Sequence, residues 1–178
     1  QHMDAANVDL KSFSEQFYHR VTLSHLAPVL ETLRWLRHET DVWFELTNLV
    51  IPQENDQEDE FERMVDWVLE NLGDEVPLHF TAFHPDFRLQ DRSATPPETL
   101  VRAREIALSA GLKYAYVGNV NDAARQSTWC PGCGALLIER DWYNLGRYAL
   151  EGNRCSACGA TVAGRFDESP GDWGPRRQ

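Results

Sequence analysis

The chain contains no long hydrophobic run and none of the motifs that mark several common enzyme classes. Within its 178 residues, no apolar stretch approaches the roughly 18 residues that span a membrane, and no secretory signal peptide is visible. No phosphate-binding loop, glycine-rich dinucleotide fingerprint or Ser-His-Asp motif can be recognised. These absences predict a cytoplasmic protein without a membrane partner.

Basic residues are scarce and unevenly distributed. The net charge is −11; residues 1–124 contain 10 Lys and Arg against 22 Asp and Glu, whereas residues 125–178 contain 7 against 6. Because nucleic-acid binding depends on basic side chains that displace counterions, we expect no nucleic-acid partner. The arginines of the second part are scattered along it and are interpreted as surface residues.

Cysteine occurs only four times, in the segments Cys130-Pro131-Gly132-Cys133 and Cys155-Ser156-Ala157-Cys158. Each C-x-x-C pair is followed by a glycine, which lets the chain turn tightly past the two sulfurs. Two such turns can place four thiolates in a tetrahedron around one metal ion. The sequence therefore predicts a zinc site with the ligands Cys130, Cys133, Cys155 and Cys158.

Three other states are compatible with four cysteines at this spacing. Two disulfides would need an oxidising compartment, and this spacing is more typical of zinc. A single iron in a rubredoxin-like site is the main competitor, because the C-P-x-C-G form also suits iron. A four-iron cluster is less favoured, since two tight turns suit one ion. Four thiolates leave no open position for water or substrate, so we expect a structural site and look for chemistry in residues 1–124.

Strand-like and helix-like segments alternate through residues 4–124, which is typical of an α/β fold built from βα units around a parallel sheet. Strands are predicted at residues 5–10, 41–51, 78–83 and 113–117. Helix starts are predicted at Ser24, at Asn55 or Asp56, and at Thr95. Four βα units make a partial, half TIM-type barrel. We therefore divide the chain into an expression-tag remnant (1–3), a half barrel (4–124), a zinc-ribbon-like module (125–168) and a tail (169–178).

An open half barrel would leave interior residues exposed, such as Trp43 and either His79 or Phe80. Parallel strands are normally covered on both faces, and exposed strand edges favour pairing. Either the rest of the barrel precedes this chain in a longer parent, or the chain covers the face by forming a homodimer.

Chemistry in β/α barrels lies at the C-terminal ends of the strands and in the loops that follow them. Those places hold Asp9 and Lys11, the loop 51–56, His84 and Asn119. Simpler explanations exist: Asp9 and Lys11 would also form an ordinary surface ion pair, and His84 with the proline after it would also form a turn.

Polar residues also occur inside the predicted strands. Glu45 and Thr47 share one face with Trp43, because side chains alternate along a strand. A carboxylate there needs a partner, which a ligand in the barrel interior would supply. His79 is interpreted as a hydrogen-bonded core histidine, and His84, beyond the strand end, as the better functional candidate.

Several segments together resemble a known family. They are Asn7-Val8-Asp9-Leu10-Lys11, the run from His38 to Glu45, the run from Ile51 to Asp56, the run from Pro77 to Pro85, Tyr116-Val117-Gly118-Asn119-Val120 and Cys130-Pro131-Gly132-Cys133-Gly134. In this order they resemble the C-terminal half of the AmmeMemoRadiSam system radical SAM (S-adenosylmethionine) enzyme, which is similar to pyruvate formate-lyase activating enzymes.

The resemblance implies a parent enzyme with a 4Fe-4S cluster that cleaves S-adenosylmethionine to a 5′-deoxyadenosyl radical and attacks an unknown substrate. The C-x-x-x-C-x-x-C segment that would hold this cluster is absent from the sequence, so we expect this chain to be inactive alone. Asp9, Lys11 and His84 match positions that line the cofactor and substrate cleft in the relatives. The family usually has Pro-Gly where this chain has Pro52-Gln53, which puts the contacts of that loop in doubt.

The resemblance leaves two functional hypotheses. In the first, the half barrel supplies part of a radical SAM active site, with Glu45, Thr47 and Asn119 lining the same cleft as the matched residues. In the second, the zinc ribbon is a protein-interaction module and the half barrel is a platform without catalytic function.

Overall fold

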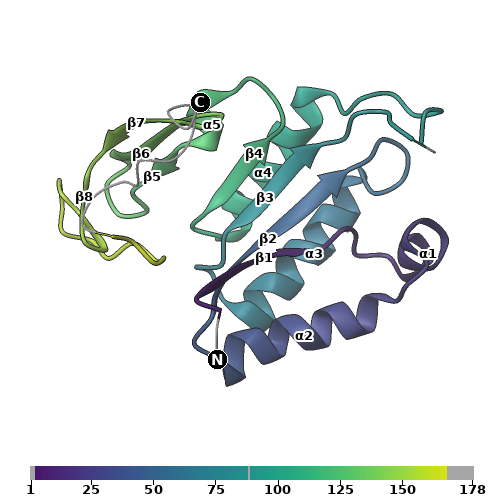
Figure 1. Cartoon of the computed structure of the whole chain (residues 1–178), viewed down its shortest axis with the longest axis horizontal. Helices are drawn as coiled ribbons and strands as arrows, with labels where there is room; N and C mark the ends of the chain where they lie inside the picture. The colour runs from purple at the N-terminus through teal and green to yellow at the C-terminus, as the bar shows by residue number, and fades with distance from the viewer. Residues whose placement is uncertain (1–2, 88, 168–178) are drawn as a thin grey trace. The chain divides into compact units, whose positions relative to one another are not determined.

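The computed structural model describes residues 3–87 and 89–167. The chain divides into two compact units after Val120, and each is described by itself (Figure 1). The predicted tail at 169–178 and two residues of the predicted tag remnant lie outside the described residues. None of the described helices is long and apolar enough to cross a membrane.

The first unit is built on a four-stranded, fully parallel sheet. Its strands are β1 (Ala5–Asp9), β2 (Trp43–Val50), β3 (Leu78–Ala82) and β4 (Ala115–Gly118). They lie side by side in chain order, β1-β2-β3-β4. In a β/α barrel each strand lies next to the preceding strand of the chain, and this sheet has the same order. The predicted α/β fold class is therefore confirmed.

Three long helices pack against one face of this sheet (Figure 1). They are α2 (Leu26–Glu39), α3 (Glu58–Leu72) and α4 (Pro97–Ala110). Because right-handed connections between successive parallel strands all cross on the same side, a sheet in this order receives all its helices on one face. Strand β2 shows the result, since every second residue of it is buried in the core.

The helix-facing side of the sheet forms the main core. Leu46, Leu78 and Phe80 are fully buried there, together with the apolar stripe of α3. Phe80 thus belongs to the core, and His79 is the residue of β3 that lies on the other face. This decides between the two residues that the sequence left open.

The loop after β1 contains helical turns that the sequence analysis did not predict, α1 (Glu15–Phe17) and the π-helical turn η1 (Tyr18–Thr22). The N-cap of α2 is His25 and not Ser24. The carboxylate of Glu15 takes the capping role, because it accepts a hydrogen bond from the backbone N–H of Leu26 at 2.9 Å.

The other two predicted helix caps were also wrong, because their side chains bind elsewhere. The N-cap of α3 is Gln57 and that of α4 is Pro96. The Asn55 side chain instead accepts from the N–H of Ile51 at 2.6 Å. The Thr95 hydroxyl donates to the Val50 carbonyl at 2.6 Å and accepts from the Phe83 N–H at 2.8 Å. Thr95 therefore joins the chain just beyond β3 to the end of β2.

The second unit is a small antiparallel ribbon. A short helix, α5 (Ala123–Gln126), precedes a three-stranded sheet of β5 (Thr128–Trp129), β6 (Leu136–Asp141) and β7 (Asn144–Tyr148). A two-stranded sheet of β8 (Leu150–Glu151) and β9 (Arg154–Cys155) follows. Few of its side chains are fully buried, so this unit needs another source of folding energy.

We predict that Thr95→Val destabilises the first unit by about 2–4 kcal/mol, because the buried N–H of Phe83 and carbonyl of Val50 lose their partner. Urea unfolding followed by circular dichroism measures this. Thr32→Val, at an exposed helix position, is the control and should change stability by less than about 1 kcal/mol. An equal effect of both substitutions would show that Thr95 has no special role.

Candidate functional site

The face of the sheet opposite the helices carries mostly polar side chains. Among the described residues of the first unit, no helix packs on this side, which we call the uncovered face of that unit (Figure 1). Its residues are half-buried or exposed and include Asn7, Asp9, Glu45, Thr47, His79, Thr81 and Tyr116. Since parallel sheets normally bury apolar residues on both faces, these polar side chains depart from the usual pattern and make this face the candidate site.

Asp9 and Lys11 form an ion pair at the C-terminal end of β1. The Lys11 Nζ lies 3.0 Å from the Asp9 carboxylate, and both side chains are partly exposed. The backbone of Lys11 is held tightly: its carbonyl accepts from the side-chain amides of Asn48 at 3.0 Å and Asn55 at 2.5 Å. Its N–H donates to the hydroxyl of Tyr18 at 3.1 Å. Burial raises the pKa of Tyr18, so this hydroxyl stays protonated at neutral pH.

Glu45 and His79 pair across strands β2 and β3. The Nε2 of His79 lies 2.7 Å from a carboxylate oxygen of Glu45, whose other oxygen accepts from the indole N–H of Trp43 at 3.3 Å. The imidazole stacks on the ring of Tyr116, with centroids 4.9 Å apart. The sequence predicts a hydrogen-bonded core histidine at position 79; His79 has the hydrogen bond but lies partly exposed on the uncovered face. The alternation of Trp43, Glu45 and Thr47 pointed to this face, but the register that sets Thr47 beside His79 was needed to add the histidine.

The remaining sequence candidates have other neighbours. Thr47 donates to the side-chain oxygen of Asn7 at 2.9 Å. His84 is exposed in the loop after β3, and its Nδ1 lies 3.1 Å from the adjacent Pro85 carbonyl. Asn119 adopts a left-handed backbone and donates to the carbonyl of Ala82 at 3.2 Å. These residues share the face or its C-terminal edge, but no hydrogen bond or ion pair links His84 or Asn119 to the Asp9–Lys11 pair.

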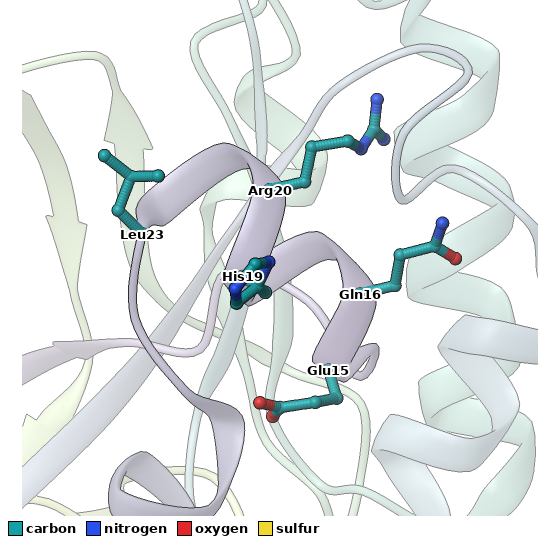
Figure 2. A pocket seen from close by; sticks show the side chains of 5 residues that line it. All are labelled: Glu15, Gln16, His19, Arg20 and Leu23. Carbon is teal, nitrogen blue, oxygen red and sulfur yellow. The ribbon is translucent and has the colours of Figure 1, made fainter.

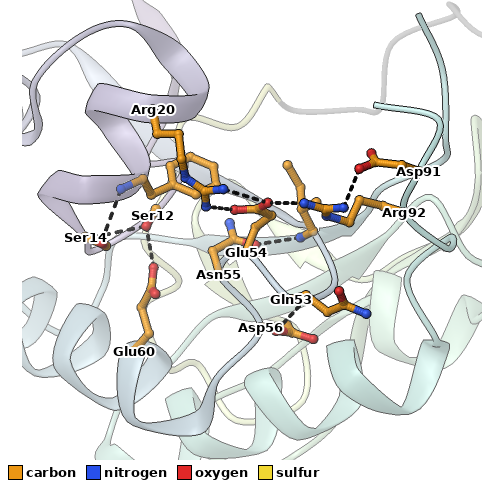
Figure 3. A network of polar contacts seen from close by, with 12 residues as sticks. Ser12, Ser14, Arg20, Gln53, Glu54, Asn55, Asp56, Glu60, Asp91 and Arg92 are labelled. Carbon is orange, nitrogen blue, oxygen red and sulfur yellow. Dashed lines mark hydrogen bonds and ion pairs between the residues drawn. The ribbon is translucent and has the colours of Figure 1, made fainter. Parts of the chain in front are cut away.

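The predicted candidate loop 51–56 proves to organise this edge. The Glu54 side chain is only 3% exposed and pairs with Arg20 from η1 and with Arg92 from the loop after β3, the latter at 2.8 Å. Figure 3 shows this carboxylate between the two guanidinium groups, with Asp91 beyond Arg92. Glu54 therefore ties together the loops that follow β1, β2 and β3.

Gln53, in the same loop, has a backbone φ of 67°. This left-handed conformation costs a residue with a Cβ atom about 1–2 kcal/mol and costs glycine little. The loop thus has the backbone shape that suits the Pro-Gly form of the resembling family. The Gln53 N–H is held by the carboxylate of Asp56 at 3.0 Å (Figure 3).

A surface pocket lies beside the turns α1 and η1 (Figure 2). Its lining comes from one short stretch of chain: Glu15, Gln16, His19, Arg20 and Leu23. Glu15 already bonds to His25, which lowers the pKa of the Glu15 carboxyl, and Arg20 is bound to Glu54. None of the candidate residues predicted from the sequence lines this pocket.

The four cysteines meet in the second unit, and together they could bind a metal ion. Their sulfur atoms all lie within 4.8 Å of one another. Cys130 and Cys158 are 3.7 Å apart at Sγ, and Cys133 and Cys155 are 3.8 Å apart. A tetrahedron with ligands about 2.3 Å from its centre has edges of about 3.8 Å. These distances fit a metal site and are far too long for disulfides, whose sulfurs lie about 2.05 Å apart.

Backbone N–H groups at this site lower the pKa values of two of its cysteines, Cys130 and Cys158. Burial raises the pKa of Cys130, but the N–H groups of Cys133 and Gly132 pull it down to about 7. The N–H of Ala160 lowers the pKa of Cys158. Hydrogen bonds with the neighbouring thiols, of which Cys133 has the largest effect, raise it to about 12. At neutral pH the cluster therefore still holds the proton of Cys158, which a bound cation would displace.

Comparisons with known proteins find a relative by sequence and a similar solved structure. No family model matches the chain. An uncharacterized protein from Methanocaldococcus jannaschii is 44% identical over 162 residues, which make up 90% of this chain and 48% of that protein. The chain therefore spans about half the length of this relative.

A solved structure resembles the chain in fold. A domain of pyruvate-formate lyase-activating enzyme from Bacteroides vulgatus superposes with a TM-score of 0.56 and 17% sequence identity, covering 65% of this chain and 68% of that one. At this identity the likeness is one of fold. The more specific resemblance to AmmeMemoRadiSam enzymes stays a prediction.

We predict that Glu54→Gln loosens the loops after β1 and β3 together. A neutral amide cannot balance two guanidinium groups, so backbone amides near Arg20 and Arg92 should exchange hydrogen for deuterium at least several-fold faster, at a stability cost of about 1–3 kcal/mol. Hydrogen exchange with mass spectrometry measures both loops at once. Glu75→Gln, which alters an exposed pair with Lys113, is the control. An unchanged rate of hydrogen exchange in either loop would contradict the role of Glu54 in connecting the two loops.

Proposed function

We propose that this chain forms part of the active-site wall of a radical S-adenosylmethionine enzyme similar to glycyl-radical-enzyme activases. The observation that carries the proposal is the fixed Asp9–Lys11 pair at the C-terminal end of β1. It lies on the uncovered face of a sheet whose fold is similar to that of a domain of an activating enzyme. The same two residues match the cleft positions of the resembling family.

In this proposal, Asp9 and Lys11 contact S-adenosylmethionine or a polar group of the substrate beside it. A carboxylate and an ammonium 3.0 Å apart offer both an acceptor and donors to a zwitterionic or polar ligand. Because Asn48, Asn55 and Tyr18 hold the Lys11 backbone, the point from which the lysine side chain extends is fixed without the ligand. Such preorganisation reduces the entropy lost on binding.

His84, Asn119, Glu45 and Thr47 complete the proposed cleft. His84 and Asn119 follow β3 and β4 at the edge where the Asp9–Lys11 pair lies, and the other two line the face behind it. The 4Fe-4S cluster and the cysteines that hold it would come from a longer parent. In that parent, the rest of the barrel would cover the open face and enclose the substrate; a homodimer through this face is the alternative for the chain by itself.

We further propose that the four cysteines hold one structural zinc ion, with iron as the alternative. The second unit buries few side chains and contains very short strands, so the ion would supply much of its folding energy. A closed site of four thiolates has no position for a substrate. The ion would therefore fold the ribbon and take no part in the reaction.

A second function is favoured by the surface of the ribbon. Trp142 and Tyr143, at the turn between β6 and β7, are 51% and 70% exposed. Exposed aromatic residues are enriched where proteins bind one another, so the ribbon would recognise a protein partner or substrate. In the full-length parent, deleting residues 125–178 should then leave cofactor cleavage intact and abolish turnover of the true substrate.

We predict that the chain alone, supplied with iron, sulfide and a reductant, produces no 5′-deoxyadenosine from S-adenosylmethionine. Its cysteines are all committed to the ribbon site, and they lack the spacing that holds the cluster. Liquid chromatography with mass spectrometry detects the product. Formation above the protein-free background would contradict the prediction.

In the full-length parent, we predict that Lys11→Ala lowers the rate of 5′-deoxyadenosine formation by roughly 10- to 100-fold, the effect of losing about 1.5–3 kcal/mol of charged hydrogen bonding. Lys113→Ala, which removes an exposed lysine at the opposite end of the sheet, is the matched control and should leave the rate unchanged. Equal rates for the Lys11 variant and the wild type would count against the proposed cleft.

We predict one metal ion per chain, with zinc found by elemental analysis. A chelator should unfold the ribbon at residues 126–166 and leave the helical circular dichroism of the first unit, and Cys155→Ser should do the same. Binding requires deprotonated thiols, so affinity should already fall with pH below about 12, where Cys158 is protonated, and fall more steeply below about 7, where Cys130 also takes up a proton. One iron with thiolate colour would favour the rubredoxin-like alternative, and metal-free chains without free thiols would overturn the site.

A further inference from the structure

The uncovered face of the sheet holds a second arrangement of polar groups that the Asp9–Lys11 pair does not involve. Glu45 and His79 come from the two central strands, and their side chains are 37% and 29% exposed. An ion pair this exposed contributes only about 0–1 kcal/mol to stability. Stability alone therefore gives little reason for a carboxylate and an imidazole at positions where parallel sheets carry apolar residues.

The histidine ring is fixed from two directions. Its Nε2 lies 2.7 Å from Glu45, and its plane stacks at 26° on the ring of Tyr116. The indole of Trp43 donates to the other oxygen of Glu45, which fixes the carboxylate in turn. The dyad is therefore held rigidly in the absence of a ligand.

This geometry determines the protonation pattern of the neutral imidazole. An ionised carboxylate can only accept hydrogen bonds, so Nε2 must carry the proton and Nδ1 must be the acceptor. Among the described residues, none forms a hydrogen bond with the Nδ1 of His79. An acceptor of known orientation is thus left for a group from outside the chain.

We infer that Glu45 and His79 form a ligand-binding dyad in which Nδ1 of His79 accepts a hydrogen bond from an O–H or N–H group of a molecule bound over the uncovered face. The inference rests on the proposed function only in that a substrate occupies this face. The ligand class is a neutral polar molecule with an alcohol, amide or amine hydrogen. If that proton moves to Nδ1, the ligand keeps the electron pair of the broken bond as an anion, and Glu45 balances the charge of the imidazolium.

The test uses iodoacetate, which alkylates an unprotonated and accessible ring nitrogen. The full chain is treated, and the chymotryptic peptide that separates His79 from His84 is hydrolysed to show which nitrogen carries the carboxymethyl group. We expect the Nδ1 derivative of His79 in roughly tenfold excess over the Nε2 derivative, because the charged hydrogen bond to Glu45 protects Nε2. His84 serves as the internal control. Its Nδ1 faces the Pro85 carbonyl, so it should give the Nε2 derivative.

Glu45→Ala should remove the protection and raise the ratio of Nε2 to Nδ1 derivative at His79 about tenfold, to near 1:1, whereas Glu39→Ala, at an exposed position in α2, should leave the ratio unchanged. If the Glu45→Ala chain does not fold, the ratio of Nδ1 to Nε2 derivative in the wild-type chain still tests the dyad. A predominance of Nε2 derivative, or a His79 that does not react while His84 does, would overturn the dyad. Neither result depends on a cluster or on cofactor cleavage, so failure of this inference is distinguishable from failure of the proposed function.

Discussion

The rest of the first unit depends on the strand order of its sheet, in which each parallel strand lies next to the one before it in the chain. Four parallel strands lie in chain order, and the long helices that connect them pack on one face, as the preference for right-handed crossovers requires. That face takes the apolar residues and forms the core. The other face is free to carry Asp9, Glu45, Thr47 and His79, whose polar groups would be costly inside a closed core. Fold and candidate chemistry thus follow from the same topology.

Buried polar side chains hold the edge of the sheet where the candidate residues lie. Asn48 and Asn55 bind the carbonyl of Lys11, Thr95 joins the chain beyond β3 to the end of β2, and Glu54 draws two arginines from the neighbouring loops. Each of these groups bonds to a partner that is distant in sequence. Together they give the edge a defined shape, which a ligand site at strand ends requires.

This dependence on distant partners explains what the sequence could and could not predict. The strands, the long helices and the cysteine cluster follow from local periodicity and spacing, and so does the shared face of Glu45 and Thr47. Asn55 and Thr95 have the composition of helix caps, but tertiary hydrogen bonds use their side chains instead. His79 could be assigned to its face only with the register between β2 and β3. The turns α1 and η1 are too short for a periodic signal.

The central claim is that the uncovered face and its C-terminal edge bind a ligand. The most direct measurement is a titration of the isotopically labelled chain with S-adenosylhomocysteine, a stable analogue of the proposed cofactor, followed by amide shifts in NMR spectra. The account predicts weak, saturable shifts centred on the backbone amides of Asp9, Lys11 and His84, which a Lys11→Ala substitution removes. Shifts confined to the pocket around His19 or to the ribbon, or no shifts at any concentration, would contradict it.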